Sequence, residues 1–175
     1  MVAAGGGGFE PATGDGPAPT VPAGTGAADS RAAEAPGAEA PGAGARAAEV
    51  RAAFEGLLQI RRTVNGEAGA DVPAPWERQR PVRAVALALE AAGLPPSAVD
   101  PADGPLRTAT GYVVGPGEAP GRARVTWAGP PGGGAAAQER ERLGACAEVL
   151  GRLGWQCLLY RGPRGRRFLE VEPPR

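Results

Sequence analysis

Glycine and proline limit most strongly what this chain can fold into, because they gather at its N-terminal end. Residues 1–47 contain 17 of them and only four large apolar residues, which are Met1, Val2, Phe9 and Val21. Such a segment buries too little apolar surface to offset the conformational entropy lost on ordering. We predict an unstructured tail over residues 1–45, which is inert or the product of a misplaced start codon, with a tether as the alternative.

One folded domain is predicted over residues 46–175, and it begins with two helices. Apolar residues recur with helical spacing from residue 46 to residue 65, where Asn65-Gly66 provides a stop. Arg61 falls inside this apolar stripe, and we expect its charged end to extend to solvent. The second helix is predicted over residues 81–93, and its mostly apolar sequence indicates burial on most of its circumference.

A ββαββ unit is predicted over residues 108–172. Short alternating segments at residues 112–114 and 122–127 indicate two strands, and a strong apolar stripe indicates a helix over residues 135–153. A hairpin with a Gly-Pro-Arg-Gly turn completes the unit. The predicted fold class is therefore α+β, with a mostly antiparallel sheet.

The first strand of that hairpin, residues 155–161, is apolar on both faces. Cys157 and Leu159 alternate with Leu158 and Tyr160. A strand of this kind is normally covered on both sides, and the helix over residues 135–153 can cover only one. We therefore expect the two upstream helices, or a second copy of the protein, to cover the other side.

Charge is distributed unevenly although the chain is neutral overall. Residues 1–106 carry 8 Arg against 13 acidic residues, and residues 107–175 carry 11 Arg against 6, so the two parts have net charges of −5 and +5. Such a basic region suggests an anionic partner. The alternative is that the two halves of one domain neutralise each other, with Glu170 and Glu172 pairing with arginines across the strands. The candidate nucleic-acid-binding residues lie at the hairpin turn and on the strand at residues 122–127: Arg161, Arg164, Arg166, Arg167, Arg122 and Arg124. All 19 basic residues are Arg, a composition typical of a high-GC bacterial genome, which weakens this interpretation.

Catalytic chemistry has little support in the sequence. The chain has no His and no Lys, so the commonest general base and the commonest metal ligand are missing. Cys146 and Cys157 do not form a C-x-x-C pair, and we interpret them as buried core thiols. We predict a non-enzymatic cytoplasmic protein with no cofactor and no metal site. The longest apolar run, Ala84–Leu89, is too short to span a membrane.

A second candidate surface consists of small residues on the helix over residues 135–153. Gly144, Ala147 and Gly151 lie together beside its apolar stripe. Glycine inside a helix costs about 1 kcal/mol relative to alanine, which suggests that another backbone approaches there. Codon bias is the alternative explanation. The function we predict is an accessory protein acting by contact with another protein or with a second copy of itself as a homodimer, and the alternative is nucleic-acid binding through the basic turn.

Overall fold

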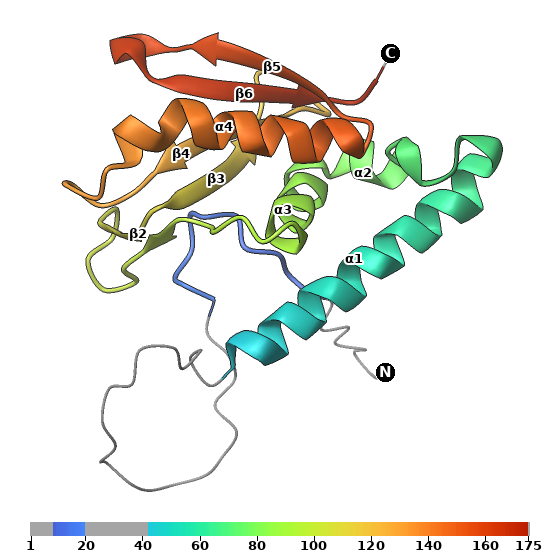
Figure 1. Ribbon diagram of the computed structural model, residues 1–175, viewed down its shortest axis with the longest axis horizontal. Coiled ribbons are helices and arrows are strands. Elements are labelled where there is room, and N and C mark those ends of the chain that lie inside the picture. The colour runs from blue at the N-terminus through green and yellow to red at the C-terminus, as the bar shows by residue number, and fades with distance from the viewer. Residues whose placement is uncertain (1–8, 20–41, 175) are drawn as a thin grey trace, which may run out of the picture.

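The computed structural model of the protein describes residues 9–19 and 42–174, and it confirms the α+β class (Figure 1). The first part contains α1 (Ala43–Asn65), the 3₁₀ helix η1 (Gly66–Asp71), α2 (Pro75–Gln79) and α3 (Pro81–Ala91). The second part contains β1 (Ala98–Val99), β2 (Arg107–Ala109), β3 (Gly111–Pro116), β4 (Ala123–Ala128), α4 (Ala135–Arg152), β5 (Gln156–Arg161), η2 (Pro163–Gly165) and β6 (Arg167–Glu172).

The main sheet is antiparallel and has the strand order β3-β4-β6-β5. Alternate residues of β4 and β6 point to one face, where Val125, Trp127, Leu169 and Val171 are buried. Helices α3 and α4 pack there and share a single hydrophobic core with the sheet. As predicted, α3 is deeply buried, since every residue of Ala84–Leu89 is inaccessible or nearly so.

Helix α1 lies against α3, on the far side from the sheet (Figure 1). Val50 and Leu57 are buried against Leu87, whereas Ile60 and Val64 are exposed although they belong to the predicted apolar face. The contact with one neighbouring helix is narrower than the apolar stripe, so the edge of the stripe remains in solvent.

Residues 9–19 correct the predicted tail, because they form an extended segment packed on the domain. The Thr13 carbonyl accepts a hydrogen bond from Val114 N (2.7 Å), and the Ala12 carbonyl accepts one from Tyr112 Oη (3.0 Å). Arg46 stacks over the Phe9 ring at 4.4 Å. Polar backbone contacts thus hold a segment whose composition is poor in apolar residues. The rest of the predicted tail, residues 1–8 and 20–41, lies outside the described residues, and α1 already begins at Ala43.

Arg61 also departs from the sequence prediction, because it is buried and does not extend to solvent. Its guanidinium pairs with the Glu77 carboxylate through Nε–Oε1 and Nη2–Oε2 contacts of 2.7 Å each. Arg61 Nη1 donates to the carbonyls of Ala70 and Leu153, both at 2.8 Å. One side chain therefore connects α1, η1, α2 and the end of α4.

Candidate functional site

Strand β5 is one of the two edge strands of the main sheet, and among the described residues no other strand pairs with its outer edge (Figure 1). Leu158, Leu159 and Tyr160 are 43%, 50% and 46% exposed, so apolar side chains project on both faces of this edge. Helix α4 contacts β5 but leaves Leu159 half exposed, and α3 contacts β3 and β4, so that Leu158 and Tyr160 also remain exposed. The prediction that the upstream helices cover this strand is therefore wrong.

The backbone of β5 also presents unused hydrogen-bonding groups. All six residues pair with β6 in an uninterrupted register, from Gln156–Glu172 to Arg161–Arg167. Just beyond the strand, Gly162 N donates to the Arg166 carbonyl at 2.7 Å. Because backbone groups alternate in direction along an antiparallel strand, those of Cys157, Leu159 and Arg161 point away from β6. Within the described residues, no other strand pairs with them.

The opposite edge of the sheet is protected. Strand β3 accepts and donates hydrogen bonds at Tyr112 with residues 95–97, and Val114 N is bonded to Thr13. An added Cβ at Gly14 would lie 2.1 Å from the Tyr112 carbonyl oxygen, so only glycine permits so close an approach. Natural sheets usually cover or charge their edges in this way. The contrast makes the uncovered apolar edge at β5 the candidate interface.

Tyr160 and Phe168 extend the apolar edge over the face of the sheet that α4 does not cover. Their rings stack with centroids 5.6 Å apart, and the Arg124 guanidinium lies 4.2 Å from the Phe168 centroid. The sequence prediction missed Phe168. The sequence could have indicated Phe168, because adjacent residues of a strand point to opposite faces. Since Leu169 points into the core, Phe168 must lie on the other face of β6.

The predicted basic surface is largely neutralised by acidic neighbours. Arg166 Nε donates to Glu139 Oε1 at 2.6 Å, and Arg167 Nη1 lies 3.7 Å from Glu139 Oε2. The Glu139 carboxylate also accepts the Arg167 backbone N–H at 3.0 Å, so it fixes the hairpin to α4.

The two predicted arginines on the neighbouring strand side are paired as well. Arg122 forms an ion pair with Glu172 at 2.6 Å, and Arg124 lies 3.2 Å from Glu118 and 3.5 Å from Glu170. The structure thus brings Arg122 and Arg124 beside β6, as the prediction of a shared basic surface required. Each of the two arginines, however, forms an ion pair with at least one carboxylate. Only Arg161 and Arg164, among the six predicted arginines, form no ion pair within the described residues.

The small-residue surface of α4 does not receive another backbone within the described residues. A Cβ added at Gly144 or Gly151 would meet no atom within 4 Å, and both glycines are exposed. Ala147 is partly buried against the main core. These residues stay together on the helix, but the structure shows open space beside the two glycines.

The two thiols are free, and their surroundings favour the protonated form. Burial raises the pKa of Cys146 from 9.0 to about 12 and the pKa of Cys157 to about 11. For Cys146 the neighbouring Cys157 adds to this effect. Thiols of this kind are poor nucleophiles at neutral pH, because the reactive thiolate is scarce.

No family model matches the chain, and comparisons with curated proteins and with solved structures likewise found no match. In the described parts of the chain, every helix is too short or too polar to cross a membrane. Within the same residues, His, Cys, Asp and Glu side chains do not gather in threes at a point where they could hold a metal ion.

Proposed function

We propose that this protein acts by protein–protein contact and that it forms a homodimer by pairing strand β5 with β5 of a second copy. The observation that carries the proposal is the uncovered edge of β5, where Leu158, Leu159 and Tyr160 are exposed next to outward-pointing backbone groups. Edge strands of this kind pair readily with another chain unless charge, proline or a bulge prevents it. Between Cys157 and Tyr160 the strand contains none of these features.

The sequence of β5 is complementary to itself in an antiparallel arrangement centred on Leu159. A two-fold axis perpendicular to the sheet places Leu159 opposite its own copy, with Leu158 opposite Tyr160 and Cys157 opposite Arg161. On one face, leucine meets tyrosine twice. On the other face, each arginine lies opposite a cysteine and not opposite another cation. Aromatic–aliphatic pairs stabilise a sheet, and like charges directly opposite each other destabilise it.

This register also satisfies the free backbone groups. Cys157, Leu159 and Arg161 each donate one hydrogen bond to the second copy and accept one from it. The result is a continuous sheet through both copies, with α4 of each copy on the same side. The contact is small, so we expect a dissociation constant of roughly micromolar magnitude. The two free thiols also agree with a reducing, cytoplasmic compartment.

Sedimentation velocity of the full chain, from low to high micromolar concentration, tests the proposal. The wild-type protein should change from monomer to dimer as its concentration rises. Leu159→Lys should remain monomeric, because it places two cations opposite each other at the axis. Val64→Lys is the matched control, since Val64 is an equally exposed apolar residue on α1. A wild-type monomer throughout, or a Leu159→Lys dimer of wild-type affinity, would refute the proposed contact.

A further inference from the structure

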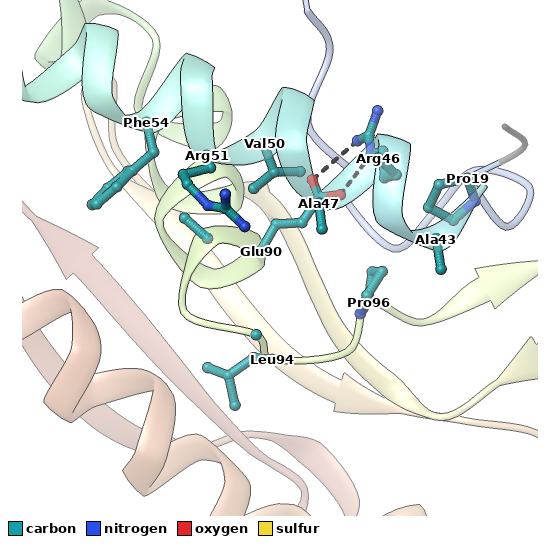
Figure 2. A pocket seen from close by; sticks show the side chains of 12 residues that line it. Pro19, Ala43, Arg46, Ala47, Val50, Arg51, Phe54, Glu90, Leu94 and Pro96 are labelled. Atoms are coloured by element: carbon teal, nitrogen blue, oxygen red, sulfur yellow. Dashed lines mark hydrogen bonds and ion pairs between the residues drawn. The ribbon is translucent and has the colours of Figure 1, made fainter. Parts of the chain in front are cut away.

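A cavity with a volume of about 650 Å³ lies between α1 and the C-terminal end of α3, away from β5 (Figure 2). Its walls are mainly apolar and include Val50, Phe54 and Leu94. A volume of this size and a wall of this kind are typical of sites for small molecules.

Two of the three charged side chains in the cavity are already satisfied. Arg46 donates to both carboxylate oxygens of Glu90, from Nε at 2.8 Å and from Nη2 at 3.1 Å. Glu90 also accepts the Ala12 backbone N–H at 2.9 Å. The charges of this pair cancel, and the hydrogen bonds fix both side chains in the wall; the dashed lines in Figure 2 mark those between Arg46 and Glu90.

Arg51 is the charge that remains. It lines the same cavity, five residues along α1 from Arg46, and Figure 2 shows its guanidinium in the space between α1 and α3. Arg51 has no ion pair or side-chain hydrogen bond with any residue of 9–19 or 42–174. Among the described residues, the cavity therefore combines an apolar wall with one positive charge, that of the exposed Arg51, which forms no ion pair there.

We propose that this cavity binds an amphipathic carboxylate, a molecule with one anionic end and an aliphatic body. The carboxylate would accept hydrogen bonds from the Arg51 guanidinium, whose planar donors match carboxylate geometry. The aliphatic body would lie along Val50, Phe54 and Leu94 and leave water. A cationic ligand is disfavoured, because Glu90 is already neutralised by Arg46 and Arg51 would repel a second positive charge.

Calorimetric titration of the full chain with decanoate, and separately with decanol, tests this assignment. Decanoate should bind more tightly than decanol, because only decanoate can pair with Arg51. Arg51→Gln should weaken decanoate binding about fivefold or more and leave decanol binding nearly unchanged. Leu94→Asp should weaken the binding of both decanoate and decanol, because it places a negative charge in the apolar wall.

Arg62→Gln is the matched control, since Arg62 is an exposed arginine on the same helix outside the cavity, and it should bind decanoate as the wild type does. Absence of decanoate binding at roughly millimolar concentration, or equal decanoate affinity in the wild type and Arg51→Gln, would overturn the proposal. Sedimentation of Arg51→Gln should still show the β5 dimer, so the two proposals can fail separately.

Discussion

Removing the Glu77 carboxylate should destabilise the protein severely, because it leaves the Arg61 cation buried without its counter-ion. The side chains of Arg61 and Glu77 are 1% and 0% exposed, so water cannot replace the lost partner. Glu77 accepts two hydrogen bonds from Arg61 and one from Ala74 N at 2.9 Å. In Glu77→Gln the shape is kept while the charge is lost.

Breaking a buried ion pair on one side costs about 3–5 kcal/mol, whereas replacing both partners with apolar residues is often nearly neutral. A domain of this size has a total stability of about 5–15 kcal/mol. We therefore expect Glu77→Gln or Arg61→Met to lower the free energy of unfolding by about 3–5 kcal/mol and Tm by about 10–20 °C. The double variant Arg61→Met/Glu77→Leu should recover much of this loss.

Urea unfolding followed by circular dichroism measures these differences. Arg62→Met is the control, since Arg62 is exposed on the same turn of α1 and its loss should cost less than about 0.5 kcal/mol. If either single variant lost less than about 1 kcal/mol, or if the double variant were less stable than both single variants, the buried pair would not hold α1, α2 and α4 together as described.

Further predictions follow from individual residues. Gly144→Ala and Gly151→Ala should each raise the free energy of unfolding by about 0.5–1 kcal/mol, because an added Cβ meets open space; a loss of stability would show an unrecognised contact. Gly154→Ala should lower it by about 2 kcal/mol or more, since its φ is +81° and the new Cβ would lie 1.9 Å from the Asp71 carbonyl oxygen; urea midpoints compare all three variants. Raising the pH above 9 should destabilise the wild type, because thiols ionise near 9.0 in the unfolded chain while burial raises the pKa of Cys146 to about 12 and that of Cys157 to about 11 in the folded chain. Urea midpoints at about pH 8 and about pH 10 should differ less in Cys146→Val/Cys157→Val than in the wild type, and an equal difference would contradict the assignment. Fluorescence anisotropy with duplex DNA should show only weak binding, because Glu139 pairs with Arg166 and Arg167; steeply salt-dependent binding that is lost in Arg164→Gln/Arg166→Gln/Arg167→Gln would favour the nucleic-acid alternative.

The helices and strands that carry strong periodicity could be predicted from the sequence. Helix α4 and strands β4 and β6 have clear apolar patterns, and each pattern corresponds to burial because a single core lies on one face of the sheet. Strand β5 was predicted from its apolar residues as well, but most of them are exposed. Strands β1 and β2 were not predicted. They contain only two and three residues, which is too short for a period to be visible.

The N-terminal segment could not be predicted, for a different physical reason. Its ordering does not come from burial of its own apolar residues, on which composition arguments depend. It comes from long-range hydrogen bonds to Glu90, Tyr112 and Val114, which are distant in sequence. Arg61 was misjudged for the same reason, because its partner Glu77 lies on a separate helix, across a loop that conveys no pairing signal.

The candidate interface was partly visible in the sequence. The sequence pattern alone indicated a strand that is apolar on both faces. The structure shows that Leu158, Leu159 and Tyr160 of this strand are exposed, so its apolar side chains are free to contact a partner. Its position at the edge of the sheet was beyond the sequence, because strand order depends on how distant segments pair. The cavity beside Arg51 was also missed, since its walls come from α1 and from the segment after α3.

Amide hydrogen exchange along β5, measured by NMR at low and at high protein concentration, tests the central claim most directly. The amides of Leu158 and Tyr160 face β6 and should be protected at both concentrations. The amides of Cys157, Leu159 and Arg161 point outward, so they should exchange quickly in the monomer and become protected as the dimer forms. Fast exchange of all three at a concentration where sedimentation shows a dimer would place the contact elsewhere and contradict pairing through β5.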